Sequence, residues 1–295
     1  MNKLLTIIVL LFGLSSPGFT DTLPEDHPVN GGMAVIPIDI KQQPEAYFQG
    51  NRIPVLPSPQ KNQWLLVVAI PLTTNEPIQY IDLTTPIKAR IPFHVSDKYY
   101  NTQFLTIKDL TKVDPQAADQ LRIANETKKL TQIYSHYSNS NPFQSSFAAP
   151  IRGPVSSLFG LKRFYNKQPR DPHSGIDIAA KEGDPVKSVS QGVVAETGDY
   201  FFTGSTVIID HGMGVFSLYA HLSKILVQTG QSIQQGQEIG LVGMTGRVTG
   251  PHLHWSMIVN QTLVEPLLFV AFRNIATTPV APAAKTIQSA ADVKS

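Results

Sequence analysis

The chain has 295 residues, enough for about two domains of ordinary size. Its composition, 42% hydrophobic and 16% charged, is typical of a globular protein and excludes a wholly disordered one. The formal net charge of +2, with no basic cluster carrying interleaved aromatics, disfavours nucleic acid as a partner. The chain contains no cysteine, so any metal site must be built from His, Asp or Glu.

Residues 1–20 have the layout of a secretory signal peptide. A short cationic start, Met1-Asn2-Lys3, precedes an apolar run from Leu4 to Leu14 and then small or turn-forming residues. The apolar run is shorter than the ~20 residues of a membrane span. We therefore expect a periplasmic or secreted protein with no stable membrane span after signal cleavage. An uncleaved anchor is the alternative.

Residues 30–110 predict a small β-sandwich domain, with the immunoglobulin-like arrangement as one candidate form. The turn Gly50-Asn51 is predicted to join two of its strands as a hairpin. About seven short β-rich runs in so short a segment are typical of a sandwich. No catalytic cluster lies in it, so we expect packing, spacing or binding of a regulatory protein. The predicted strands are Met33–Ile40, Ala46–Phe48, Arg52–Leu56, Trp64–Leu72, Ile78–Leu83, Ala89–Val95 and Gln103–Ile107.

Residues 114–138 predict one linking helix. Asp114 is a candidate N-cap, and Pro115 suits the first helical position. The residues that follow at helical spacing are Ile123, Thr127, Leu130, Tyr134 and Tyr137. At the other end of the chain, residues 277–295 are rich in Ala, Thr, Pro and Lys without periodicity, which predicts a disordered tail.

Residues 150–272 predict a compact antiparallel β domain, because glycines separate short β-rich runs that show no helical period. The predicted fold class is therefore mainly β: a small sandwich, one linking helix and this second β domain. Histidines concentrate in the second domain, which contains His173, His211, His221, His252 and His254.

Three predicted strands of this domain carry side chains able to bind a metal. The run His252–Val259 alternates polar and apolar residues, so His252 and His254 share one face while Leu253 and Trp255 enter a core. Ile176 and Ile178 similarly place Asp177 on an accessible face, with His173 folded back from the preceding loop. Ser217, Tyr219 and His221 are predicted to share one face of a third strand.

Taken together, these residues suffice for a catalytic zinc site with three protein ligands, an open water position and acid–base histidines nearby. The pattern leaves open which histidine of the His252–His254 pair would bind the metal.

The segment from Pro150 to Phe269 resembles the lysostaphin-type, LytM-like M23 zinc endopeptidases, which cut peptidoglycan cross-links. The resemblance lies in four motifs in order: His173-Ser-Gly-Ile-Asp177, Ile209-Asp-His-Gly212, Leu218-Tyr-Ala-His-Leu222 and Thr249-Gly-Pro-His-Leu-His254. It implies an M23 peptidase fold, with Zn²⁺ as cofactor and peptidoglycan as substrate. The bond implied in a Gram-negative setting is the D-Ala–meso-diaminopimelate cross-link.

The resemblance also implies residue roles. His173, Asp177 and His254 would be the zinc ligands. His221 and His252 would flank the zinc-bound water that attacks the scissile carbonyl, as general base and transition-state stabiliser. Predicted to border the substrate groove are Phe201, Phe202, Tyr219 and Arg247.

Three further expectations remain. His211 is predicted to have a turn or supporting role rather than to bind metal. The upstream sandwich, helix and Asn139–Asn141 linker are predicted to cover the groove until displaced. The alternative function is a non-catalytic binding or regulatory protein of the same fold that activates another cell-wall hydrolase.

Overall fold

The computed structural model describes residues 22–275. The predicted signal peptide, 1–20, and the predicted disordered tail, 277–295, lie outside these residues and stay predictions. Within the described range, no helix is long and apolar enough to cross a membrane.

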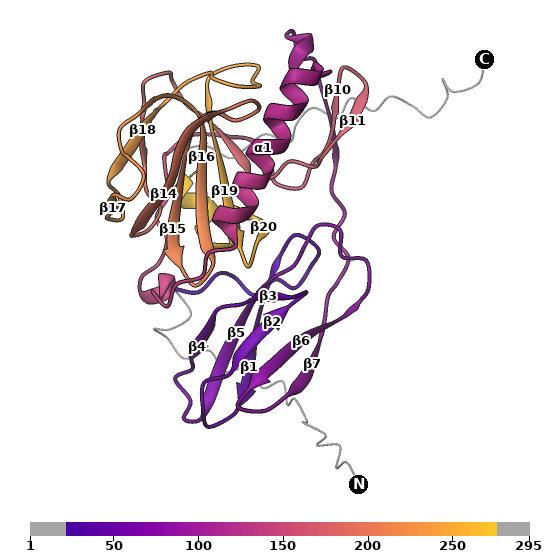
Figure 1. Ribbon diagram of the computed structural model, residues 1–295, viewed down its shortest axis with the longest axis vertical. Helices are drawn as coiled ribbons and strands as arrows, with labels where there is room; N and C mark the ends of the chain where they lie inside the picture. Colours follow the sequence, from indigo (N-terminus) through magenta and orange to yellow (C-terminus); the bar gives the residue numbers. More distant parts are fainter. Residues whose placement is uncertain (1–21, 276–295) are drawn as a thin grey trace, which may run out of the picture.

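The described chain is mainly β, as predicted, with two β domains and one long helix (Figure 1). The first domain is a sandwich of a three-stranded sheet, ordered β1-β5-β4, and a four-stranded sheet, ordered β3-β2-β6-β7. Its strands are β1 (Met33–Asp39), β2 (Glu45–Phe48), β3 (Asn51–Arg52), β4 (Val55–Pro57), β5 (Gln63–Ala69), β6 (Ile78–Thr85) and β7 (Ala89–His94).

Strand β5 explains why the sandwich does not stand alone. Its Leu66 and Val68 are buried in the core between the two sheets, whereas Val67 and Ala69 are buried in the core of the second domain. A strand buried on both faces needs a continuous apolar run instead of alternation. The Asn260 side chain accepts a buried hydrogen bond of 2.9 Å from the Ala69 backbone, which also joins the two domains.

Three details of the sandwich differ from the predictions. The run Arg52–Leu56 divides into β3 and β4, which pair in different sheets, because Pro54 between them has no backbone N–H to donate. The hairpin turn is Gln49-Gly50, with φ of 49° and 82°, and not Gly50-Asn51. Strand β8 (Thr102–Leu105) leaves the sandwich and pairs in parallel with β10 of the second domain.

The second domain is built on a ten-stranded sheet with the central order β17-β14-β15-β16-β19-β12-β9. A separate small sheet, β11-β10-β8, lies beside it. The strands are β9 (Val155–Ser157), β10 (Lys162–Tyr165), β11 (Gln168–Arg170), β12 (Ile176–Ala179), β13 (Pro185–Lys187), β14 (Gly192–Tyr200), β15 (Gly204–Gly212), β16 (Val215–Ile225), β17 (Ser232–Ile233), β18 (Glu238–Val242), β19 (His252–Val259) and β20 (Thr262–Val264).

The large sheet has two faces with different partners. One face carries Leu253, Trp255 and Met257 of β19 into the main core. The opposite face carries Phe216 and Ile258 into a smaller core, which also contains Leu218 and Ala220 and packs against Leu130, Ile133 and Tyr134 of helix α1. Figure 1 shows α1 lying across the sheet beside β16 and β19.

Helix α1 spans Ala117–Tyr134 and begins later than predicted. Its N-cap is Gln116, which makes no side-chain cap hydrogen bond. Asp114 cannot cap the helix because its carboxylate bonds to Gln168 and lies 3.5 Å from Arg170, both on β11. The remaining short elements are η1 (Leu110–Lys112), η2 (Pro142–Gln144), η3 (Pro266–Leu268) and α2 (Phe272–Ile275).

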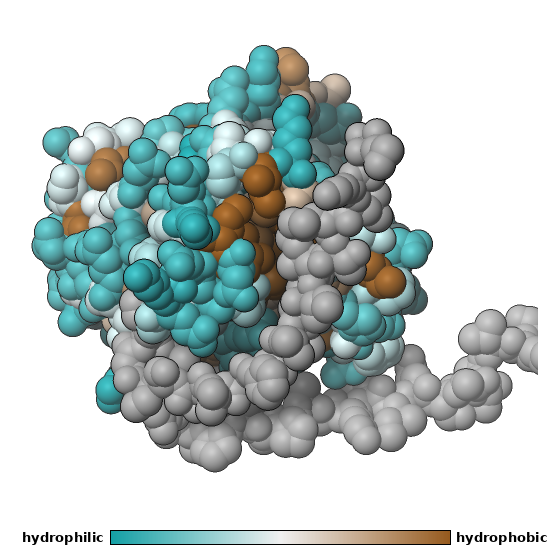
Figure 2. All heavy atoms as spheres, turned by 90° about the horizontal axis from the view of Figure 1, so that it is seen from below, coloured by the Kyte–Doolittle hydropathy of each residue, from teal (hydrophilic) through white to brown (hydrophobic). Residues whose placement is uncertain are grey.

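On the part of the molecular face that Figure 2 shows in colour, hydrophilic side chains predominate, and hydrophobic ones form one central group and a few smaller ones. Exposed single apolar residues are normal on a folded protein.

Candidate metal site

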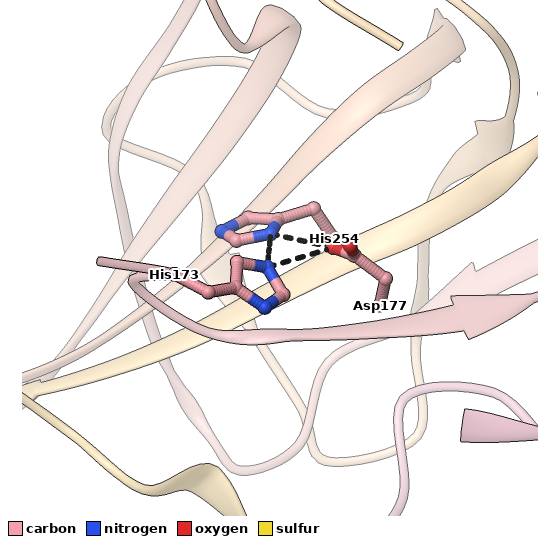
Figure 3. Close-up of side chains that lie close together, drawn as sticks. All are labelled: His173, Asp177 and His254. Carbon is pink, nitrogen blue, oxygen red and sulfur yellow. Dashed lines mark hydrogen bonds and ion pairs between the residues drawn. The ribbon is translucent and has the colours of Figure 1, made fainter. Parts of the chain in front are cut away.

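Strands β12 and β19 bring three candidate ligands together. In their antiparallel pairing Asp177 lies directly opposite His254, so both side chains leave the same face of the sheet. His173 reaches them from the loop before β12 (Figure 3). The atoms His173 Nε2, His254 Nδ1 and Asp177 Oδ1 are separated by 3.0, 3.0 and 2.9 Å.

Hydrogen bonds on the far side of each ring select the nitrogens that face the centre. His173 Nδ1 donates to the Leu158 carbonyl over 2.7 Å, and because a carbonyl only accepts, the neutral ring keeps a lone pair on Nε2. His254 Nε2 lies 2.9 Å from the Ser256 hydroxyl, which can accept a hydrogen bond from Nε2–H and so leave the lone pair on Nδ1. Buried lone pairs that converge with a carboxylate oxygen are satisfied by a cation.

The distances also fit a metal. Tetrahedral ligands at 2.0–2.1 Å from zinc stand about 3.3 Å apart, and the observed separations are only slightly shorter. Among residues 22–275, His173, Asp177 and His254 are the group identified as able to hold a metal ion. Two imidazoles and one carboxylate form a donor set that suits a divalent transition metal.

The electrostatics of Asp177 and His254 favour metal binding over protonation. Burial lowers the pKa of His254 to about 4, so this ring is neutral at neutral pH. Burial raises the pKa of the Asp177 carboxyl, but the hydrogen bonds and positive charge that His173 and His254 supply in their protonated forms outweigh burial and hold that pKa well below its usual value. The site therefore presents neutral imidazole and ionised carboxylate, the forms that coordinate metal.

His221 and His252 lie beside this group. Their ring centroids are 4.8 Å apart, and the His221 ring is 5.9 Å from that of His254. His221 Nδ1 donates to the Thr245 carbonyl and His252 Nδ1 to the Gly250 carbonyl, each over 2.8 Å. Each neutral ring thus keeps the lone pair on its Nε2 atom. His252 Nε2 lies 3.7 Å from Asp177 Oδ1.

A β-bulge positions His221, contrary to the predicted alternation. His221 has a φ of 63°, and the register with β15 shifts around it. Tyr219, before the bulge, faces the main core, whereas the bulge turns His221 to the same face as Ala220, the face that carries His254. Burial, and then the neighbouring His252 and His254, lower the pKa of His221 to about 3, so its ring is also neutral at neutral pH.

The residues predicted to border a groove separate into two groups. Tyr219 is fully buried, and its hydroxyl accepts a hydrogen bond from the Val189 backbone, so this prediction is wrong. Phe201 is also buried, with the Lys112 ammonium 3.7 Å from its ring centroid. Phe202 and Arg247 are half-buried and stack, with the guanidinium 4.1 Å from the ring centroid.

His211 is not part of the group of candidate metal ligands. It is buried and bonds to the Gln191 carbonyl and to the Ser217 hydroxyl, each over 2.7 Å. Burial lowers its pKa to about 4.

The residues that hold the candidate metal ligands in position were not predicted from the sequence. Arg163 of β10 pairs with Asp177 Oδ2 at 2.9 Å, and Ser157 and Ser256 bond to the ligand histidines. Ser256 could have been found, because it follows His254 by two residues on the same strand face. Arg163 lies outside every motif and is brought to the site only by the tertiary fold.

The fold agrees with the comparisons to known proteins. The model of peptidase family M23 matches residues 171–266, and that of the peptidase family M23 N-terminal domain matches residues 26–98. A solved structure from Pseudomonas aeruginosa, assigned to peptidase M23, is 35% identical with a TM-score of 0.69, covering 83% of this chain and 96% of that one. The chain belongs to peptidase family M23.

Curated relatives match part of the chain. Peptidoglycan DD-endopeptidase ShyA of Vibrio cholerae is 40% identical over 149 residues, which are 47% of this chain and 34% of ShyA. DD-carboxypeptidase/endopeptidase Mpg of Neisseria meningitidis is 41% identical over 113 residues, which are 38% of this chain and 26% of Mpg. The chain spans about a third or less of the length of these curated relatives.

Proposed function

We propose that this protein is a zinc-dependent endopeptidase that hydrolyses peptide cross-links of peptidoglycan. One observation carries the proposal: two imidazole nitrogens and one carboxylate oxygen converge within 3.0 Å of one another, with two further histidines beside them. A buried group of this kind is costly to assemble unless a cation completes it.

The ligands in this proposal are His173, Asp177 and His254. Zinc bound there would lower the pKa of a coordinated water and polarise the scissile carbonyl. His221 is neutral at neutral pH and its Nε2 is free, so it can accept a proton. His252 Nε2, oriented by the Gly250 carbonyl, can donate to a developing oxyanion when protonated or pass a proton to the leaving amine.

The names of two relatives support the substrate assignment: one is a peptidoglycan DD-endopeptidase and the other a DD-carboxypeptidase/endopeptidase. We propose the D-Ala–meso-diaminopimelate cross-link as the bond cleaved. The predicted signal peptide supports a periplasmic or secreted location, where this substrate is found. A regulatory protein that binds the sandwich domain also remains part of the proposal.

The alternative, a non-catalytic activator of another hydrolase, is less well supported. Such a role would need neither a complete ligand set nor two histidines whose Nδ1 atoms are tied to carbonyls while both Nε2 atoms stay free. The five side chains His173, Asp177, His221, His252 and His254 support the enzyme over the activator.

We further propose that the segment 110–126 restricts access to the site. Lys112 donates to the Phe201 carbonyl over 2.9 Å, Arg247 donates to the Lys112 carbonyl over 3.3 Å, and Glu126 accepts from the Phe201 N–H. These contacts come from η1 and α1. The predicted linker lies elsewhere, with Ser140 packed against Gly212 at the other end of β15.

Digestion of purified sacculi tests the proposed activity. Wild-type protein with zinc should convert cross-linked muropeptides into monomers, each cleavage adding one water to the product mass. The masses would also name the bond. Cross-linked muropeptides that persist unchanged, with a folded and zinc-loaded protein, would reject the catalytic assignment in favour of the activator.

A further inference from the structure

Arg163 of β10 contacts one of the candidate metal ligands directly. The Arg163 Nη2 atom donates to Asp177 Oδ2 over 2.9 Å and to the Ser157 hydroxyl over 3.1 Å. Its Nη1 atom donates to the Tyr165 hydroxyl over 3.0 Å. The Arg163 and Asp177 side chains are only 14% and 12% exposed. Solvent therefore screens this ion pair weakly.

The two oxygens of Asp177 have separate tasks. Oδ2 is bound by Arg163, while Oδ1 faces His173 and His254. A charge-assisted hydrogen bond in a buried setting is strong and directional. The carboxylate cannot rotate to exchange its oxygens without breaking it.

The same guanidinium reaches a second ligand through Ser157. The Ser157 hydroxyl lies 3.2 Å from His173 Nδ1, and Ser157 is paired with Asp177 across strands β9 and β12. His254 is held differently, by Ser256. Arg163 thus contacts one ligand directly and a second through one hydroxyl.

We propose that Arg163 is a positioning residue of the metal site, which holds Asp177 with only Oδ1 turned toward the metal and steadies His173 through Ser157. Two of the three ligands are thereby oriented before metal binds. This inference rests on the proposed zinc site.

The sign of one measurement separates positioning from simple charge. A guanidinium repels a divalent cation, so charge alone predicts that removing Arg163 tightens zinc binding. Positioning predicts the opposite, because the ligands of a loosened site must be ordered when the metal binds.

Zinc affinity, measured by competition with a chromophoric chelator, is the test. We expect Arg163→Gln to bind zinc about 10–100-fold more weakly than wild type. Arg163→Lys, which keeps the charge but loses the two-pronged geometry, should be intermediate, and Ser157→Ala should lose less. The matched control is Arg170→Gln. Arg170 lies opposite Arg163 in the β10–β11 pair and contacts none of the three candidate metal ligands. The zinc affinity of this variant should therefore equal that of the wild type.

Equal or tighter zinc binding by Arg163→Gln would overturn the inference, as would an equal loss in the Arg170→Gln control, which would indicate a general role of the hairpin. If circular dichroism shows Arg163→Gln to be unfolded, Arg163→Lys and Ser157→Ala decide, and wild-type affinity in both rejects the proposal. A wild-type protein that binds no zinc would reject the proposed function itself, and this inference with it.

Discussion

Two ends of one sheet face have opposite characters. At one end of β16 and β19, His221, His252 and His254 gather around Asp177. At the other end of the same face, Phe216 and Ile258 lie under helix α1. Helix α1 covers the apolar end. The candidate metal site lies at the other end, where backbone carbonyls accept hydrogen bonds from His221 and His252. One strand pair serves both ends, and substitutions at the two ends should therefore have separable effects.

The largest expected effect is at the polar end. His221→Ala should lower kcat/KM on cross-linked muropeptides by roughly 10²–10⁴-fold, because an oriented proton acceptor is lost. Zinc affinity should be nearly unchanged, since His221 is not among the three converging ligands. Steady-state kinetics together with metal analysis checks this. Near wild-type activity in the zinc-loaded variant would remove His221 from the mechanism.

The next effect is at the apolar end. Phe216→Ala should lower the free energy of unfolding by about 3–5 kcal/mol, because Phe216 is fully buried and packs edge-on against Tyr134 of α1. Urea unfolding measures it, with Leu121→Ala, an exposed position on the same helix, as the matched control. A Phe216→Ala protein with wild-type stability would show that α1 is not packed on the sheet as described.

The third effect is the pH dependence of folding stability that the buried His211 causes. Burial lowers its pKa to about 4, whereas the unfolded chain would titrate near 6.5. The unfolded state then binds more protons between these values, so stability is fully present above about pH 6.5 and falls toward pH 4, by on the order of 2–3 kcal/mol from this residue.

Urea unfolding at pH 7 and pH 4.5 measures that loss. His211→Gln should show a smaller drop between the two pH values than wild type, although His221 and His254 contribute in the same window. An identical drop in the variant would contradict the assignment. A lowered pKa alone does not identify a catalytic residue, because His211 has a lowered pKa but is not part of the group of candidate metal ligands.

The smallest effect concerns access. Glu126→Gln should weaken the contact between α1 and the Phe201 backbone, and hydrolysis of sacculi should rise several-fold if that contact restrains the site. A point substitution tests this restraint better than removal of all residues up to Asn141. Such a deletion would also remove Val67 and Ala69, which belong to the core of the second domain. Glu45→Gln on the sandwich is the control, and equal rates for all three proteins would reject the restraint.

Much of this molecule follows from local patterns, and the exceptions have identifiable causes. Alternation along β19 correctly predicted that His252 and His254 share a face opposite Leu253 and Trp255. Alternation along β16 failed at His221, because a β-bulge with positive φ there shifts the register with β15. Before the bulge, alternation correctly placed Tyr219 opposite Leu218 and Ala220, but that face of β16 is buried in the main core.

Contacts between distant segments were also beyond local patterns. The cap predicted at Asp114 failed because Gln168 and Arg170, more than fifty residues away, bind its carboxylate. Strand β8 was assigned to the sandwich because its propensity says only that it is a strand, while its pairing with β10 depends on the whole fold. Arg163 reaches Asp177 through that same small sheet.

The central claim is that a metal held by His173, Asp177 and His254 carries the hydrolysis of peptidoglycan cross-links. The most direct measurement compares wild type with His254→Ala for bound zinc and for muropeptide release from purified sacculi, in the same preparations. The expected result is about one zinc per wild-type chain with release of monomers, and neither in a folded His254→Ala protein. Undiminished release by a folded, zinc-free His254→Ala protein would contradict it.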